Sequence, residues 1–295
     1  MYRPDTFTYS LQQRLLASDC ELPFLSRSDG NADIVLKLLT RAAMPERTTP
    51  WHHGRSLTID ETPDEKLLVR FEDETSFLVT ATSIELVAAP AQYTVDDIAA
   101  YALGPVIAIA LHLQGAVLLH ASSVVMNGKA VVFAGHSGSG KSTIAAILHR
   151  HGYAVLSDDI TELAGTRALA SIPAMRLWPD VVHALFGEQA VFPDRAPSWD
   201  KKLVVVEEAP PAEIAAVLFL DERADTPRLQ RLAPRDAWRH LMANIYTATL
   251  PGEATARRIF EITSALADDV PMYTFAPPPI EHADTLGEFL ERELR

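Results

Sequence analysis

Residues Ala134–Thr143, AGHSGSGKST, contain the pattern G-x-x-x-x-G-K-[ST] without a mismatch. An apolar AVVFA run typical of a β-strand leads into it, and a TIAAILH run typical of a helix follows. In such a strand–loop–helix unit, the loop's backbone N–H groups turn toward phosphate oxygens, and the helix N-terminus adds partial positive charge. The sequence therefore predicts a nucleotide-binding α/β domain.

Different residues of this phosphate loop are expected to bind the phosphates of ATP and the Mg²⁺ ion. Lys141 is expected to reach the β- and γ-phosphates, and the Ser142 hydroxyl is expected to ligate Mg²⁺. The predicted nucleotide-binding residues are Gly135, His136, Ser137, Gly138, Ser139, Gly140, Lys141, Ser142 and Thr143.

Two neighbouring carboxylates, Asp158 and Asp159, follow the apolar segment YAVLS. A strand that comes directly after the phosphate-loop helix should end at the edge of the sheet where α/β proteins bind ligands. Two acids at that edge predict a division of roles, in which one holds Mg²⁺ and the other accepts a proton from an attacking hydroxyl.

Asn127-Gly128 stands between two β-rich runs and predicts a two-residue hairpin. That turn pairs Met126 with Lys129 and brings His120 opposite Gly135, the first residue of the phosphate loop. The register thus predicts His120 at the phosphate site, against the alternative of a hydrogen-bonded core histidine.

Composition narrows the classes of function. The 295 residues carry a formal net charge of −13 and a single cysteine, Cys20. Such acidity argues against nucleic-acid binding and against an anionic membrane surface. One cysteine cannot form an internal disulfide, so we expect a reducing, cytoplasmic location. The apolar segment Tyr101–Leu119 contains Gly104-Pro105 and is interpreted as a broken core helix followed by a strand rather than a membrane span.

The order of patterns along the chain predicts two parts. Residues 1–92 contain short apolar or alternating runs separated by turn residues, which indicates a β-rich N-terminal domain and a candidate for acceptor recognition. Residues 93–295 contain the phosphate loop and alternate between strand and helix patterns, which indicates the catalytic core.

The segment LLHASSVVMNGKAVVFAGHSGSGKSTIAAILHRHGYAVLSDDITEL resembles the catalytic core of HPr kinase/phosphorylase. That family has a histidine strand, a hairpin, a GxSGxGKS loop, a helix and a strand that ends in two aspartates. The resemblance implies a P-loop core with a mixed sheet flanked by helices and a role for His120. It also implies that Asp158 is the proton acceptor and Asp159 the metal ligand, and it suggests a homo-oligomer.

The wider layout is similar to a divergent branch of these kinases. Thr143 stands where the family usually has glutamate, and segments RLWPD and KKL follow the core. Some members of that branch phosphorylate the C-terminal serine of a lasso-peptide precursor. The resemblance therefore adds Arg176, Lys201 and Lys202 as candidates to neutralise the transferred phosphoryl group.

The combined expectation is an ATP-dependent kinase that phosphorylates a serine-type hydroxyl of a peptide or protein acceptor. Two alternatives stay open at this stage, namely a small-molecule kinase and a nucleotide-sensing regulator without transfer. Against a motor or switch, the strand ends in Asp-Asp, and neither an LSGGQ-type nor an NKxD motif occurs.

Overall fold

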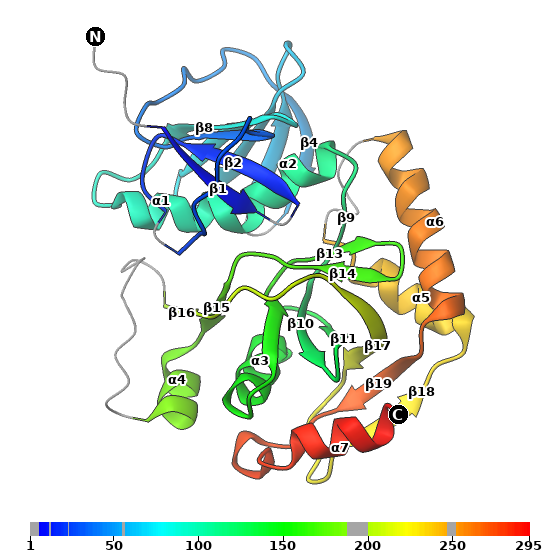
Figure 1. The fold of residues 1–295 in the computed structure, drawn as a ribbon. Coiled ribbons are helices and arrows are strands. Elements are labelled where there is room, and N and C mark those ends of the chain that lie inside the picture. The colour runs from blue at the N-terminus through cyan, green and yellow to red at the C-terminus, as the bar shows by residue number, and fades with distance from the viewer. Residues whose placement is uncertain (1–5, 12, 23, 55–56, 188–199, 247–251) are drawn as a thin grey trace. The chain divides into compact units, whose positions relative to one another are not determined.

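The computed structural model describes residues 6–11, 13–22, 24–54, 57–187, 200–246 and 252–295 (Figure 1). Its contacts divide the chain into two compact units, of which the first extends to Ala116 and the second begins at Val117. The helical segment that starts at Val95 therefore belongs to the first unit, whereas the sequence patterns grouped it with the core.

The first unit contains an eight-stranded sheet in the order β1-β2-β3-β8-β7-β6-β5-β4. The pairs β2–β3 and β3–β8 are parallel and the other pairs antiparallel. The strands are β1 Phe7–Leu11, β2 Arg14–Ser18, β3 Ile34–Lys37, β4 Thr49–His53, β5 Leu57–Glu61, β6 Leu67–Phe71, β7 Ser76–Val79 and β8 Ser83–Ala88. The expectation of a β-rich N-terminal region is met.

Three consecutive helical segments complete this unit: α1 Val95–Tyr101, the π-helical η1 Ala102–Val106 and α2 Ile107–Leu113. Thr94 and Asp97 form a reciprocal capping box at the start of α1. Gly104 departs from helical geometry (φ −105°, ψ −110°) just before Pro105, which breaks the helix where the sequence predicts a break. By length and composition Val95–Leu113 would suffice to cross a membrane, but 72% of its most apolar window is buried inside the protein, as in a core helix.

The second unit is built on a mixed sheet in the order β12-β10-β11-β17-β14-β13-β9, with β19 beside β17 and β18 beside β19. Its strands are β9 Val117–Leu119, β10 Ala121–Met126, β11 Lys129–Ala134, β12 Ala154–Ser157, β13 Thr161–Ala164, β14 Arg167–Leu169, β17 Ala212–Leu220, β18 Arg228–Arg231 and β19 Met272–Ala276. A separate pair joins β15 Ala174–Leu177 to β16 Lys202–Val205. This arrangement confirms the predicted α/β class with a mixed sheet.

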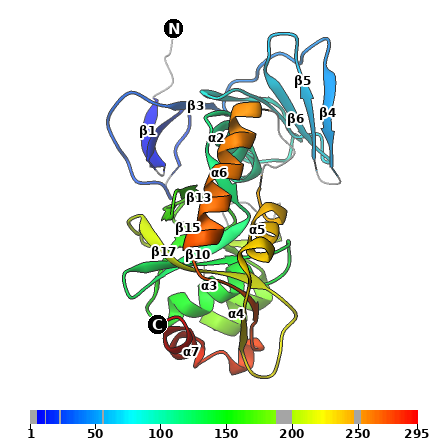
Figure 2. The ribbon, with the colours of Figure 1, turned by 90° about the vertical axis from the view of Figure 1, so that its right-hand side faces the viewer.

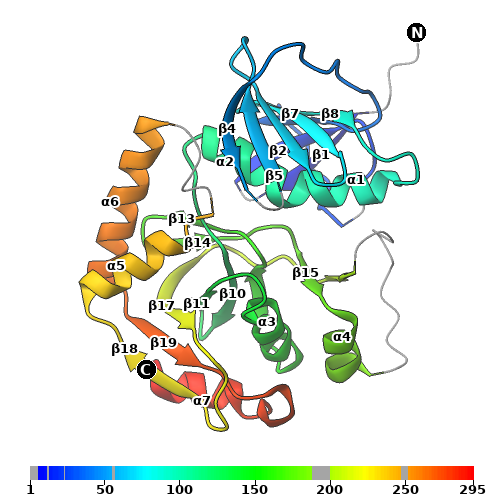
Figure 3. The ribbon, with the colours of Figure 1, turned by 180° about the vertical axis from the view of Figure 1, so that it is seen from behind.

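Helices cover both faces of this sheet (Figures 1 and 3). They are α3 Lys141–Arg150, α4 Pro179–Phe186, α5 Pro234–Ala243, α6 Glu253–Asp269 and α7 Leu286–Glu293, with the short 3-10 helix η2 Ile280–His282 before α7. Alternating residues of β11 supply the two cores: Val131 and Phe133 pack with α3, α4 and α7, and Val132 packs with α5 and α6.

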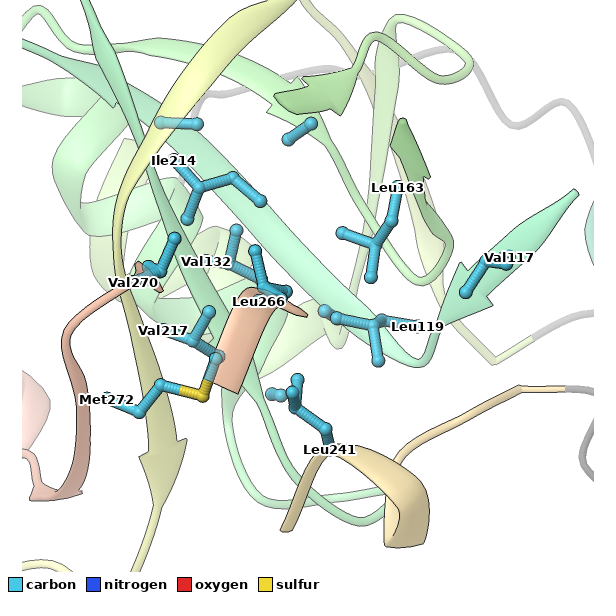
Figure 4. Packing of buried hydrophobic residues seen from close by; sticks show 14 of the residues in the cluster. Val117, Leu119, Val132, Leu163, Ile214, Val217, Leu241, Leu266, Val270 and Met272 are labelled. Atoms are coloured by element: carbon cyan, nitrogen blue, oxygen red, sulfur yellow. The ribbon is translucent and has the colours of Figure 1, made fainter. Parts of the chain in front are cut away.

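The core under α5 and α6 is shown in Figure 4, where Leu241 and Leu266 approach Val132 and Val217 of the central strands. Figure 2 shows α6 running across this face of the sheet. All four side chains are almost completely buried. The two strands next to the phosphate loop, β11 and β17, are therefore packed against side chains on both of their faces.

Strand direction brings several loop segments to one edge of this sheet. β11, β17 and β19 are mutually parallel, and β10 is antiparallel to both β11 and β12. The start of β10 and the ends of β11, β12, β17 and β19 therefore share an edge. His120, the phosphate loop, Asp158 and the segments after Leu220 and Ala276 all lie there.

Candidate functional site

The predicted hairpin has the predicted register. Met126 pairs with Lys129 across Asn127-Gly128, and the ladder continues without a bulge to Ala121 opposite Ala134. His120 is the residue immediately before β10, and its backbone N–H donates to the Asn244 carbonyl at 2.8 Å. The predicted register is therefore confirmed as far as Ala121, and the ladder ends one residue before the predicted His120–Gly135 pair.

The phosphate loop forms an open cradle at the start of α3. Gly138 and Gly140 have φ values of 84° and 97°, which side chains with a Cβ rarely adopt. Gly140 is the N-cap of α3 and provides no side-chain cap, so the first N–H groups of the helix lack a capping acceptor. Such a helix start is suited to bind an anion.

Lys141 is buried within this cradle. Its ammonium donates to the carbonyls of Gly135 at 2.8 Å and His136 at 2.9 Å. An ammonium has three protons, so one donor remains for a ligand. Burial lowers the pKa of Lys141, while the negative charges of Asp159 and Asp158 oppose that shift.

A cleft of about 230 Å³ opens over the loop. Its walls consist of the loop residues, the start of β10, the end of β12, the β15–α4 connection, the residue before β16 and the segment after β17. The lining residues are His120, Ser137, Gly138, Gly140, Lys141, Ser142, Thr143, Asp159, Arg176, Leu177, Trp178, Asp180, Val181, Lys201 and Arg223. Four cations and two carboxylates thus meet in one cleft of an acidic chain, which makes the cleft locally favourable to anions.

Asp159 is the aspartate of the pair that faces the cleft. Its Oδ1 lies 3.2 Å from His120 Nε2, and its Oδ2 lies 4.0 Å from Arg176 Nη1. Burial alone would raise the pKa of Asp159, but the His120 hydrogen bond and the charges of Arg176 and Lys201 lower it to about 2. Asp159 also has a φ of 68°, an uncommon conformation for a residue other than glycine that is concentrated at functional sites.

Asp158 points elsewhere. Its Oδ1 accepts from the Ser122 hydroxyl at 2.6 Å, and its Oδ2 accepts from the Arg176 backbone N–H at 3.0 Å. It is 9% exposed and does not belong to the cleft lining. Asp158 therefore ties the end of β12 to β10 and β15, and it orders the segment that carries Arg176.

Buried hydroxyls support the same end of β12. Ser157 exchanges hydrogen bonds of 2.6 Å with both Ser123 and Thr161, and Thr161 donates to the Ala121 carbonyl at 3.1 Å. These bonds join β10, β12 and β13 beneath the site. They fix the backbone from which Asp159 projects.

The remaining predicted residues fall into two groups. Ser137, Gly138, Gly140, Ser142, Thr143, Arg176 and Lys201 line the cleft. Four predicted residues lie outside its lining: Gly135, His136, Ser139 and Lys202 on β16. The exposed His136 ring forms a hydrogen bond with the Ser137 carbonyl, and Ser139 lines a smaller neighbouring cavity. Lys201 Nζ lies 5.4 Å from the centroid of the Trp178 ring, which holds the cation near the cleft.

Sequence patterns missed Trp178, Asp180, Arg223 and Tyr246. Trp178 and Asp180 belong to the RLWPD segment, which the resemblance had singled out without giving them a role. Arg223 and Tyr246 belong to no motif. The Tyr246 ring packs edge-on against the His120 ring, with ring centroids 5.7 Å apart. Burial is the main cause that raises the pKa of Tyr246, and the negative charge of Asp159 raises it further.

No known protein family and no curated protein matches the sequence. Among solved structures, the chain is similar to the Hpr(Ser) kinase/phosphatase from Coxiella burnetii, with 16% sequence identity and a TM-score of 0.33. The alignment covers 60% of this chain and 88% of that one. At this level of similarity, the role of each residue has to be inferred from its own surroundings.

Proposed function

We propose that the chain is an ATP-dependent kinase that transfers the γ-phosphate to a serine-type hydroxyl of a peptide or protein. One observation carries the proposal: the phosphate loop, the Asp159 carboxylate and four basic side chains line a single cleft. Phosphoryl transfer needs little covalent help from the protein, but it requires positioned phosphates, neutralised charge and an oriented hydroxyl.

The residues of the cleft fit ATP and Mg²⁺. The uncapped start of α3, the two positive-φ glycines and Lys141 supply N–H and ammonium donors for phosphate oxygens. Ser142 and Asp159 would hold Mg²⁺ together with those oxygens. Among the described residues, no group of three or more His, Cys, Asp or Glu side chains is placed to hold a metal ion. Bound Mg²⁺ would neutralise phosphate charge.

Asp159 takes the central role in this proposal. A carboxylate with a pKa of about 2 is ionised at every physiological pH, which suits a group that binds a cation or accepts a hydrogen bond from a hydroxyl. His120 holds one of its oxygens, and Arg176 and Lys201 would stabilise the negative oxygens of the transferred group. We assign Asp158 a positioning role instead, because both of its oxygens are engaged outside the cleft.

The first unit offers support for a peptide acceptor. Its edge strand β4 contains Pro50, a residue typical of sheet edges, and Trp51, whose side chain is 41% exposed. At the opposite edge of the sheet, the backbone of β1 already has hydrogen-bond partners. The Ser10 N–H donates to the Ser26 carbonyl, and the Ser28 N–H donates to the Thr8 carbonyl. An extended peptide that adds to β4 would gain main-chain hydrogen bonds and an aromatic contact.

The test is an acceptor screen with labelled Mg-ATP. Candidate acceptors are precursor peptides with a C-terminal serine, unrelated serine peptides, free serine and sugars, and products are identified by tandem mass spectrometry. A gain of one phosphate on a peptide serine, lost in Asp159→Asn, supports the proposal. Efficient labelling of a free metabolite would instead indicate a small-molecule kinase. Rapid ATP hydrolysis without any acceptor would favour a nucleotide-driven regulator.

A further inference from the structure

A second, smaller cavity adjoins the phosphate cleft. Its volume is about 10 Å³, and it shares Gly140, Thr143 and Arg223 with the larger cleft. Its other lining residues are Ser139, Ile144, Ile147, Pro277, Pro278 and Leu286, most of which are apolar. The two cavities therefore adjoin at Gly140, Thr143 and Arg223, and the smaller one is mainly apolar.

The order of the phosphates indicates which side the nucleoside occupies. The residues that line only the larger cleft include Asp159, Arg176 and Lys201, the groups proposed to act on the γ-phosphate. Thr143, which follows Lys141 and Ser142 on α3, lines both cavities. The α-phosphate, and with it the ribose and the base, would therefore leave the cleft past Thr143. One helical turn later on the same face is Ile147, which lines the apolar cavity.

Arg223 is held beside this apolar surface. The Asp221 N–H donates to the Phe275 carbonyl at 2.8 Å, and the Ala224 N–H donates to the Pro277 carbonyl at 3.0 Å. These two bonds fix the backbone on both sides of Arg223 against the segment that leads to the prolines. The guanidinium lies over the phosphate loop, with Nη2 3.6 Å from the place that a Cβ on Gly140 would take.

The guanidinium is available for a ligand. Among the described residues Arg223 has no ion-pair partner, and its side chain is exposed. A planar guanidinium stacks well on an aromatic ring, and the rigid, apolar rings of two prolines suit the opposite face. The cavity is far smaller than a base, so the long Arg223 side chain must move outward to admit one.

We propose that the base of the nucleotide lies between the Arg223 guanidinium and the Pro277-Pro278 segment, over the Ile147 face of α3. This inference rests on the proposed nucleotide-dependent function and adds the residues that recognise the nucleoside. Because stacking and apolar contact do not read hydrogen-bonding edges, the slot accepts purines without strong discrimination between ATP and GTP.

The experiment compares Mg-ATP with Mg-tripolyphosphate, which has the same chain of three phosphates and no nucleoside. Binding of both to the full chain is measured by isothermal titration calorimetry. For Arg223→Ala we expect ATP affinity to fall about tenfold more than tripolyphosphate affinity, because the lost charge affects both ligands and the lost stacking on the base affects ATP alone. Arg223→Lys keeps the charge but loses the planar face, so it should lose ATP affinity to a similar extent.

A matched control variant separates a local effect from a general one. Arg239→Ala removes an exposed arginine on α5, outside both cavities, and should change the affinity of neither ligand. Equal weakening of both ligands by Arg223→Ala would make Arg223 a phosphate ligand and overturn the proposal, as would no effect on either. If the unmodified protein bound neither ligand, the proposed function itself would fall, and with it this inference.

Discussion

The two adjacent aspartates give the sharpest test of the site, because the structure assigns them different surroundings. Asp158→Asn should leave stability and transfer nearly unchanged. The new amide can still accept from the Arg176 N–H through its oxygen, and its NH₂ can donate to the Ser122 hydroxyl, which also accepts. Asp159→Asn keeps the shape but removes the charge that faces the cleft, so transfer should fall at least ~100-fold.

Asp158→Ala shows what the buried contacts contribute. It removes two hydrogen bonds to a charged acceptor and leaves a buried hydroxyl and a backbone N–H without a partner. At about 1.5 kcal/mol for each group, the expected loss of unfolding free energy is about 3 kcal/mol. For a domain of this size that loss lowers the Tm by about 6–12 °C.

The assays are peptide phosphorylation at varied Mg²⁺ and differential scanning calorimetry of each variant. An increased Mg²⁺ requirement in Asp159→Asn would assign its carboxylate to the metal, and a lower rate at saturating Mg²⁺ would assign it to the hydroxyl. If Asp158→Asn lost at least ~100-fold in transfer while its Tm was unchanged, Asp158 would be the proton acceptor. The positioning role argued from its hydrogen bonds would then be wrong.

Three further predictions concern other parts of the chain. Lys141→Ala should abolish transfer and lower ATP affinity in titration calorimetry, whereas unchanged affinity would refute the phosphate-loop assignment. The pKa of Asp159 is lowered from 3.8 to about 2, so its ionisation stabilises the fold above pH ~4, and that stability is lost as pH falls toward 2. Acid titration monitored by circular dichroism should therefore show less acid destabilisation between those pH values in Asp159→Asn than in the wild type. Thr94→Ala removes the α1 cap and should cost about 1 kcal/mol in urea unfolding of the first unit, and no change in midpoint would contradict it.

Local sequence patterns were sufficient to predict the strand–loop–helix unit around the phosphate loop and the hairpin register that leads to His120. The loop follows a fixed pattern, and the Asn127-Gly128 turn sets a register that can be counted from the sequence alone. Both features depend on residues within about twenty positions of each other. Short-range geometry therefore determined them before the strand order was known.

The positions of Asp158 and Arg223 depend on contacts between strands that are far apart in the sequence, so sequence patterns did not predict them. Asp158 turns away from the cleft because the β15 backbone supplies an N–H at Arg176, eighteen residues later in the chain. Arg223 reaches the phosphate loop because β17 lies parallel to β11 although some eighty residues separate their partners, such as Ala134 and Phe219. No periodicity within either strand specifies this pairing, so the residues that follow β17 carried no sequence signal.

The mixed sheet explains why a single edge collects all of these groups. An antiparallel β10 between β11 and β12 places the start of one strand beside the ends of two others, so His120 enters the site from the opposite chain direction to the phosphate loop. The parallel strands β17 and β19 then bring Arg223 and Pro277 to the same edge, where they line the small apolar cavity beside the phosphate loop. The groups proposed to act in phosphoryl transfer and those proposed to contact the nucleoside therefore come from different strands of one sheet. A substitution in the first set should change transfer to the acceptor, and a substitution in the second set should change nucleotide affinity.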